Sequence, residues 1–315
     1  MSCKITVIGA GNVGATVAYT LSRESFVTEI VMIDINKEKA FGEVMDMEQG
    51  TCFRSPISLK AGDYEDAEGS DLVVITSGIG RKPGQTRLEL TQTNVNIMKD
   101  IAQKIPKHAP DAKYVIVANP VDILTYVFTK ISGIPESQII GSGTQLDTAR
   151  LRFMLSEEIG LSQSNIHAYV LGEHGDTSFV PWSACYVGGQ QLDAYVALME
   201  DMGEPIHDIN RDEVMQYVRK SGGTIIANKG ATFYGVAASV CNLCKILMSA
   251  KPSTTTVSTM LHGEYGIEDV CLSMLVELGP NGVEHRIPFQ MTDEEVEMMK
   301  KSAAALKDVI AQVEI

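Results

Sequence analysis

The sequence predicts an α/β protein in which a doubly wound, mostly parallel sheet is followed by a second, α+β domain. Two observations predict this fold class. From residue 4 to about residue 140, short apolar runs typical of buried strands alternate with segments whose apolar residues recur at helical spacing. The first of these strands also leads, with no spacer, into a glycine-rich loop.

The N-terminal strand, loop, helix and second strand predict a Rossmann-type dinucleotide site. Residues 4–8 form the first strand, residues 29–34 form the second, and the loop between strand and helix is Gly9-Ala10-Gly11-Asn12-Val13-Gly14. Gly9 permits a tight turn, Gly11 lets the backbone approach a pyrophosphate, and Gly14 lets the helix lie close to the sheet. A glycine loop alone also fits a plain turn, but here the strand, the helix and the acid at Asp34 agree.

The acid that ends the second strand indicates which cofactor the site takes. A carboxylate at Asp34 can bind both hydroxyls of an adenosine ribose, and it repels a 2′-phosphate. The next two residues, Ile35 and Asn36, supply no arginine to bind such a phosphate. The sequence therefore favours NAD over NADP.

The alternation continues beyond Asp34. The expected elements are a helix over 37–49, strands over 57–61 and 71–76, a helix with its apolar face over 95–105, a strand over 113–118 and a helix over 121–132. Parallel strands align their carboxyl ends at one edge of the sheet, where such sheets bind ligands. We therefore expect Gly11, Asp34, Gly78 and Asn119, which follow four of these strands, to lie near one another.

The pattern changes at about residue 141, so we expect a first domain over residues 1–142 and a second over residues 143–315. The second is expected to hold a helix over 145–159, strands over 166–171 and 179–187, two further helices, strands over 254–261 and 270–278, and a C-terminal helix opened by a capping box at 292–295. No linker or repeat separates the halves, which predicts that they are tightly docked.

Composition excludes several classes of partner. The formal net charge of −14 argues against nucleic acid or an anionic membrane, because both would repel the chain. No apolar stretch is long enough to span a bilayer, and the N-terminus lacks the pattern of a signal peptide. Six scattered cysteines suit a reducing compartment, so we expect a cytoplasmic protein. Cys241 and Cys244 lie in an apolar helical run and predict core packing rather than a metal site.

One histidine is the candidate for acid–base chemistry. His174 follows the strand over 166–171, within the loop Gly172-Glu173-His174-Gly175-Asp176. A histidine taken alone is more often a surface or satisfied core residue. Asp147 and Arg150, three residues apart on one helix face, fit either a surface ion pair or a functional pair. In the functional interpretation Asp147 orients His174 and raises its pKa, while Arg150 binds a carboxylate through two parallel hydrogen bonds.

A cationic loop follows the strand over 71–76. It holds Arg81, Lys82 and Arg87 between glycine and proline residues. A run of charges is usually a solvated surface. The flanking residues nevertheless suit a hinged lid, and a closing lid that carries an arginine would exclude water and polarise a carbonyl.

These segments resemble the lactate/malate dehydrogenase family along essentially the whole chain. The matching segments are the glycine loop, the lid ending in Arg87, Asn119-Pro120-Val121-Asp122, the run from Gly141 to Arg150 and the His174 loop. The resemblance implies an NAD-dependent enzyme that transfers hydride between the cofactor and a small 2-hydroxy or 2-keto acid. The cofactor-binding residues that it implies are Gly9, Gly11, Asn12, Val13, Gly14, Asp34, Gly78 and Asn119.

The resemblance also implies a role for each catalytic residue. His174 would be the acid and base and Asp147 its support; Arg87 would polarise the carbonyl, Asn119 would bond the carbonyl or the nicotinamide side, Arg150 would hold the α-carboxylate, and Thr232 would line the C3 side of the substrate.

The residues that resemble the family indicate two different substrates. Glu173, Thr232 and the Gly141 to Arg150 run resemble L-lactate dehydrogenases. Arg81, six residues before Arg87, stands where lactate enzymes of this family have glutamine and malate enzymes have arginine. A buried charge pair is worth several kcal/mol, whereas a threonine near C3 tunes fit by about 1 to 2 kcal/mol. Arg81 therefore favours malate and oxaloacetate, with lactate and pyruvate as the alternative; a shift of the lid could present Lys82 instead.

The family also suggests assembly and regulation. It implies a homodimer or homotetramer, with a patch of Ala40, Val44 and Met47 as a plausible contact. Many bacterial lactate dehydrogenases are activated by fructose 1,6-bisphosphate through an arginine and a histidine at a subunit interface. Arg152 matches the arginine, but Tyr169 stands where the histidine is expected, which argues against this activation.

Two more distant functions stay open. An NAD-dependent glycosidase shares this type of fold, but it needs a metal site, and the sequence offers no cysteine and histidine cluster for one. A nucleotide-binding module with a decayed site is a non-enzymatic alternative. Retention of Asp147, Arg150 and His174 together argues against decay.

Overall fold

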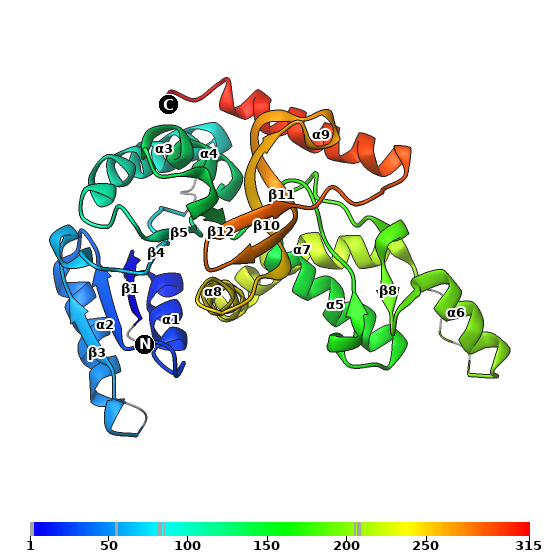
Figure 1. The fold of residues 1–315 in the computed structure, drawn as a ribbon, viewed down its shortest axis with the longest axis horizontal. Helices are drawn as coiled ribbons and strands as arrows, with labels where there is room; N and C mark the ends of the chain where they lie inside the picture. Colours follow the sequence, from blue (N-terminus) through cyan, green and yellow to red (C-terminus); the bar gives the residue numbers. More distant parts are fainter. Residues whose placement is uncertain (1–2, 54–55, 81–83, 85, 205, 207–208) are drawn as a thin grey trace.

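The computed structural model describes residues 3–53, 56–80, 84, 86–204, 206 and 209–315. Figure 1 shows the first half of the chain on one side and the second half on the other, with the C-terminal helix lying across the top. A nine-stranded sheet is the spine of the described structure. The predicted α/β fold class is confirmed, with a Rossmann-like sheet followed by a second α/β region.

Six parallel strands form the nucleotide-binding part of this sheet. In spatial order they run β3-β2-β1-β4-β5-β6, with bounds Ser58–Ala61, Glu29–Ile33, Lys4–Ile8, Leu72–Ile75, Lys113–Ile116 and Ile139–Gly141. The order reverses between β1 and β4, which is where open parallel sheets bind dinucleotides. Strand β6 was not predicted, because three residues are too few to show a pattern.

The first half supplies four helices to the faces of the sheet. They are α1 (Asn12–Leu21), α2 (Lys37–Gln49), α3 (Arg87–Lys104) and α4 (Val121–Ile131). Helix α3 begins at Arg87, inside the segment that we expected to be loop. Thr86 accepts a hydrogen bond from the backbone of Glu89, whose side chain accepts from the backbone of Thr86, and this reciprocal capping box explains the earlier start.

The second half adds three antiparallel strands to the same sheet. They are β10 (Ser253–His262), β11 (Glu268–Gly279) and β12 (Gly282–Arg286), and β10 joins the sheet where Ser258 pairs with Gly141 of β6. A side chain at Gly141 would collide with Thr125, since an added Cβ would lie 2.4 Å from its Oγ1 atom. The predicted tight docking of the halves thus takes the form of one continuous sheet.

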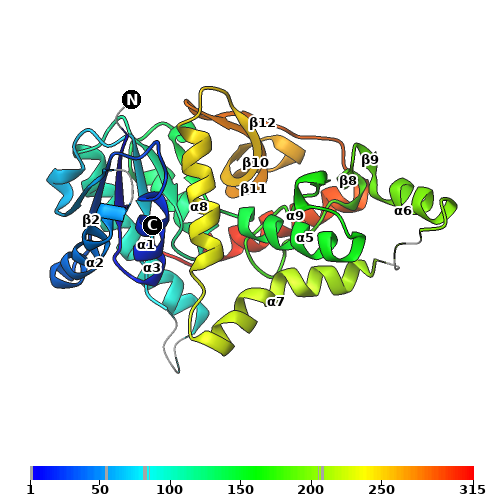
Figure 2. The same ribbon diagram turned by 90° about the horizontal axis from the view of Figure 1, so that it is seen from below.

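The remaining helices belong to the second half of the chain. They are α5 (Gln145–Ile159), α6 (Leu192–Asp201), α7 (Arg211–Lys229), α8 (Tyr234–Leu247) and α9 (Asp293–Ile310). Figure 2 shows α8 standing between the first-half helices and α7, and α8 packs on α1. Among the described helices, none combines the length and the apolar character needed to cross a membrane.

The two strands predicted after α5 are much shorter than expected. The segment forms a small sheet of β7 (Ile166–His167), β8 (Tyr186–Val187) and β9 (Gln190–Gln191), plus a single bridge between Leu171 and Phe179. Pro181 has no backbone N–H to donate, and a short 3-10 turn at Trp182–Ala184 follows it. The strand expected over 179–187 is therefore interrupted at Pro181, and the bridge between Leu171 and Phe179 closes the base of the loop that carries His174.

The predicted contact patch on α2 is wrong. Ala40, Val44 and Met47 are buried in the chain's own core, where α2 packs on β3. Phe41 and Met45, on the neighbouring face of the same helix, are exposed instead. Helical periodicity identified the apolar stripe but could not say which neighbour would cover it.

Candidate active site

The glycine loop lies at the point where the strand order reverses. Gly9 has a φ of 108°, and a Cβ added there would lie 2.7 Å from Thr76 Oγ1. A Cβ on Gly14 would lie 1.8 Å from the carbonyl oxygen of Gly9, so the close approach of α1 to the loop requires glycine. A Cβ on Gly11 would meet nothing within 4 Å, which leaves open space beside the N-terminus of α1. This space and the free N–H groups of the first turn fit a pyrophosphate.

Asp34 follows β2 and is tied to the glycine loop. Its Oδ2 atom accepts a hydrogen bond from the backbone N–H of Ala10 at 2.6 Å, and its Oδ1 atom accepts from Asn36 at 2.8 Å. The half-buried carboxylate is therefore fixed beside the loop, as the ribose-binding acid of an NAD site must be. The residues present fit NAD.

A buried asparagine that the sequence analysis did not single out joins the strand ends. Asn94 of α3 accepts a hydrogen bond from the backbone of Ile79 at 2.9 Å and donates one to the carbonyl oxygen of Asn119 at 2.8 Å. It thereby fixes the turn after Gly78 against the end of β5. A polar residue on an otherwise apolar helix face was the available signal.

The two candidate catalytic residues from distant parts of the second half meet directly. His174 Nδ1 lies 2.5 Å from Asp147 Oδ2, and Arg150 donates to Asp147 Oδ1 at 2.9 Å. The Asp147 carboxylate is nearly buried, whereas 27% of the His174 side chain is exposed. With Nδ1 held by Asp147, Nε2 is the ring nitrogen left for a substrate.

This arrangement shifts both pKa values in the directions that acid catalysis needs. Burial opposes ionisation of Asp147, but the charges and hydrogen bonds of His174 and Arg150 outweigh it and hold the pKa of the carboxyl below its ordinary value. Burial also opposes the imidazolium form of His174. The charge and hydrogen bond of Asp147, together with the charge of Asp122, outweigh both burial and the repulsion from Arg150, so the pKa of His174 is raised.

A pocket of about 310 Å³ is lined by most of the residues that we expected to contact the substrate. Its lining includes Asn119, Asp147, Arg150, His174 and Thr232, and it reaches Val13 at the start of α1. The elements that supply these side chains are far apart in the sequence. The structure thus places the imidazole of His174, the amide of Asn119 and the guanidinium of Arg150 in a pocket beside the nucleotide loop.

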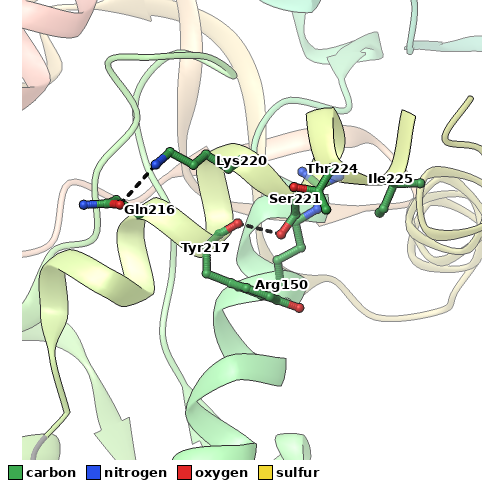
Figure 3. A pocket seen from close by; sticks show the side chains of 7 residues that line it. All are labelled: Arg150, Gln216, Tyr217, Lys220, Ser221, Thr224 and Ile225. Atoms are coloured by element: carbon green, nitrogen blue, oxygen red, sulfur yellow. Dashed lines mark hydrogen bonds between the residues drawn. The ribbon is translucent and has the colours of Figure 1, made fainter. Parts of the chain in front are cut away.

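Helix α7 forms one wall of this pocket. Gly222 lies close to Arg150, because a Cβ added there would be 3.6 Å from its Nη2 atom. Figure 3 shows Arg150 rising from α5 toward Tyr217, Ser221 and Thr224 on the outer side of α7, around a surface pocket of about 470 Å³. Arg150 is therefore held between α5 and α7.

The structure does not bring Arg87 into the pocket. Its guanidinium pairs with Asp176 Oδ2 at 3.1 Å, and the two side chains are 78% and 81% exposed. This pair lies at the rim, between the start of α3 and the His174 loop. Arg81 and Lys82, on which the sequence-based prediction of the substrate rests, lie outside the described residues.

The pocket also contains a cation that the sequence analysis did not identify. Arg219 of α7 lines it and donates a hydrogen bond to the carbonyl oxygen of Ser178. Nothing local in the sequence distinguishes Arg219 from the other charges of α7, because only the packing of α7 over the His174 loop places it there. A second guanidinium is thus available beside Arg150.

The predicted regulatory face holds a histidine after all. Arg152 donates to the carbonyl oxygen of Ala168 at 3.1 Å, and its guanidinium carbon lies 5.2 Å from the centre of the Tyr169 ring. His167 and Tyr169 both line a surface pocket of about 480 Å³. Residues two apart in an extended segment face the same side, so the tyrosine at 169 does not remove histidine from this face. The absence of activation by fructose 1,6-bisphosphate stays a prediction.

Comparison with known proteins assigns the chain to a family. The family model described as the lactate/malate dehydrogenase NAD-binding domain matches residues 3–141, and the model of the α/β C-terminal domain of the same family matches residues 144–315. The L-lactate dehydrogenase of Acetivibrio thermocellus is 43% identical over 312 residues, which cover 99% of this chain and 98% of that protein. The L-lactate dehydrogenase of Thermoanaerobacter pseudethanolicus is also 43% identical, with 99% of each chain covered.

Solved structures agree with this assignment. A lactate dehydrogenase from a Medee basin deep-sea metagenome library has a TM-score of 0.94 at 35% identity, covering 99% of this chain and 98% of its own. The minor L-lactate dehydrogenase of Enterococcus mundtii has a TM-score of 0.94 at 34% identity, covering 100% and 99%. The chain belongs to the lactate/malate dehydrogenase family and is an NAD-dependent dehydrogenase of 2-hydroxy acids.

Proposed function

We propose that this chain is an NAD-dependent L-lactate dehydrogenase, which interconverts pyruvate and L-lactate. The observation that carries the proposal is the contact of His174 with Asp147 at 2.5 Å, in a pocket that also holds Arg150 and opens toward the glycine loop. An imidazole, a supporting carboxylate and a guanidinium are the groups that reduction of a 2-keto acid requires.

Each residue has one proposed task. Bound NADH supplies the hydride for the carbonyl carbon of the substrate. Protonated His174 donates its Nε2 proton to the carbonyl oxygen, and Asp147 holds the ring in the orientation that exposes Nε2. Arg150 retains N–H groups beyond the one bound to Asp147, and these hold the α-carboxylate.

Asn119 and Thr232 line the same pocket and complete the proposed site. Asn119 would donate to the carbonyl oxygen, and Thr232 would border C3 of the substrate. Arg87 lies at the rim, where its pairing with Asp176 joins the start of α3 to the catalytic loop. Closing of the lid segment would have to move this guanidinium inward before it could polarise the carbonyl.

The names of the relatives support lactate over the malate interpretation that Arg81 favours. Both bacterial relatives described above are named L-lactate dehydrogenase and match almost end to end. Thr232, one of the two residues that resemble those of lactate enzymes, lines the pocket. The other, Glu173, precedes His174 in the loop, and its side chain accepts a hydrogen bond from Thr177.

Malate is the second candidate, because of one residue. An arginine at position 81 can pair with the second carboxylate of oxaloacetate, and opposite the methyl group of pyruvate it would be left buried without a partner. Arg219 is a further cation within the described pocket that could serve a dicarboxylate.

One steady-state experiment separates the two candidates. NADH oxidation is measured with pyruvate and with oxaloacetate for the wild type, Arg81→Gln and the matched control Lys82→Gln. The lactate proposal expects a higher kcat/KM for pyruvate in the wild type. A preference of about 10²-fold for oxaloacetate that Arg81→Gln reverses and Lys82→Gln keeps would establish the second candidate. Absence of turnover with both acids would contradict the dehydrogenase site.

Assembly, domain boundary and location are proposals of the same kind. We propose a homodimer or homotetramer, supported by the exposed apolar side chains Phe41 and Met45 on α2. Light scattering after gel filtration tests it. The boundary between residues 142 and 143, just before α5, and the cytoplasmic location also stay predictions.

A further inference from the structure

Two carboxylates hold His174, and only Asp147 touches its ring. The other is Asp122, which lies in the first turn of α4. Asp122 is only 2% exposed. Its Oδ2 atom accepts a hydrogen bond from the backbone N–H of His174 at 2.8 Å. Asp122 thus fixes the main chain of the residue whose side chain Asp147 orients.

The surroundings of Asp122 make its charge costly. Its Oδ1 atom is buried without a hydrogen-bond partner among the described residues. Ser258 of β10 lies beside the carboxylate and favours its charged form, but neither Oδ1 nor Ser258 Oγ has a hydrogen bond of good geometry. Burial raises the pKa of Asp122 to about 6, against the opposing effects of Ser258 and His174.

A purely structural anchor would not need this charge. Asparagine could accept the same N–H hydrogen bond through its amide oxygen without burying an ion. The groups that face Asp122 do not stabilise its charge as water would. Glu173 repels the carboxylate, and the Cys271 thiol of β11 is buried beside it. The positive charge that His174 can carry is the partner that favours a carboxylate here, together with the N-terminus of α4.

We propose that Asp122 is a positioning residue for His174, fixing the backbone of the catalytic loop and favouring, through its negative charge, the imidazolium that donates the proton. The second half of this statement rests on the proposed function of His174. Asp147 is nearer to the imidazole and raises the pKa of His174 more than Asp122 does. Asp122 adds a smaller effect in the same direction from helix α4.

The other charged groups around the imidazole set the size of the effect. From α5, Asp147 raises the pKa of His174 and Arg150 lowers it. From α4, Asp122 raises it. Arg87, Asp176 and Arg219 stand farther out, at the rim and on α7. The contribution of Asp122 is therefore one among several, and it can be removed alone.

The variant Asp122→Asn tests the charge while keeping a hydrogen-bond acceptor. The readout does not depend on turnover: diethyl pyrocarbonate modifies the neutral imidazole, and mass spectrometry of the His174 peptide at several pH values gives the pKa of His174. We expect this pKa to fall by about 0.5 to 1 unit. An unchanged pKa overturns the proposal.

Asp269→Asn is the matched control. Asp269 also interacts with α4, but it pairs with Lys130 on the exposed side of that helix, at 2.7 Å. The Asp269→Asn variant removes the same charge, but Asp269 is not among the groups that shift the pKa of His174. We expect no change in the pKa of His174, and a shift equal to that of Asp122→Asn would mean that net charge alone is responsible and would overturn the proposal.

The pH profile of pyruvate reduction supplies the functional readout. The active enzyme carries protonated His174, so kcat/KM falls as pH rises through its pKa. In Asp122→Asn this fall should begin at lower pH, leaving kcat/KM near the wild-type value at pH 6 and about 3- to 10-fold lower at pH 9. A loss that is equal at every pH indicates a structural role only and overturns the charge effect. If no variant and no wild type reduces pyruvate, the proposed function fails, while the chemical modification still tests the link between Asp122 and His174.

A second variant covers the case in which Asp122→Asn does not fold. Ser258→Ala removes the hydroxyl that favours the charged form of Asp122, so the carboxyl holds its proton to higher pH. The pKa of His174 should then fall in the same direction and by a smaller amount. No fall in that variant overturns the proposal.

Discussion

The two sides of His174 present similar acids whose pKa values are shifted in opposite directions. On the α5 side, Asp147 is 5% exposed and both its oxygens are hydrogen-bonded, and its pKa is held below the ordinary value. On the α4 side, Asp122 is 2% exposed with one oxygen hydrogen-bonded, and its pKa is raised to about 6. Burial is nearly equal on the two sides, so the number of hydrogen-bond donors and cations around each carboxyl decides in which direction its pKa shifts.

Removing the shared partner of both acids should have the largest effect. His174→Asn should lower kcat for pyruvate reduction by about 10³-fold or more, because an asparagine side chain cannot donate a proton to the carbonyl oxygen as the imidazolium does. Fluorescence titration should show NADH binding within a few-fold of the wild type. His285→Asn, an exposed histidine of β12, is the control and should retain full activity. Near-normal turnover by His174→Asn would rule out the acid–base role.

Removing the charge of Asp147, on the α5 side of His174, should have the second-largest effect. Asp147→Asn keeps the shape of the side chain but removes the charge that stabilises the imidazolium and pairs with Arg150. We expect kcat/KM to fall by about 10²-fold at pH 7 and the pKa of His174 to fall further than in Asp122→Asn. The comparison is wrong if Asp122→Asn shifts this pKa by the larger amount.

Breaking the α4 side should change how stability depends on pH. The pKa of Asp122 is about 6 in the folded chain against an ordinary value of 3.8, so burial of the ionised carboxylate destabilises the fold above pH 6 and not below pH 3.8. Relative to Asp122→Asn, the wild type should lose about 2 to 3 kcal/mol of unfolding free energy as pH rises through this window. Urea unfolding at pH 4 and pH 7 measures it. A difference between the two proteins that does not change with pH would contradict the raised pKa.

Removing the ion pair between Arg87 and Asp176 at the rim of the pocket should have the smallest effect. Arg87 and Asp176 are both mostly exposed, and exposed ion pairs contribute about 0 to 1 kcal/mol. Asp176→Asn should therefore leave the thermal midpoint unchanged within about 2 °C. Loss of several degrees would show that the pair is more buried in solution than its exposure indicates.

Local sequence patterns were enough to predict the nucleotide-binding unit. The strand, the three glycines and Asp34 lie within one short stretch, and each works through its own backbone or its neighbours. Prediction was weaker where a feature depends on distant packing. The burial of Ala40, Val44 and Met47 in the chain's own core, the short strands around His174 and the position of Arg219 all depend on which segment lies opposite.

The sequence by itself determined the fold class, the preference for NAD and several of the residues that line the pocket around His174, because periodicity, glycine spacing and charge are local properties. Only the tertiary structure decided that Asp122 supports the backbone of His174 and that β10 extends the nucleotide-binding sheet. Residues on α4, α5 and the His174 loop come together only when the chain folds, and the pKa of each acid depends on the donors and the burial that folding supplies.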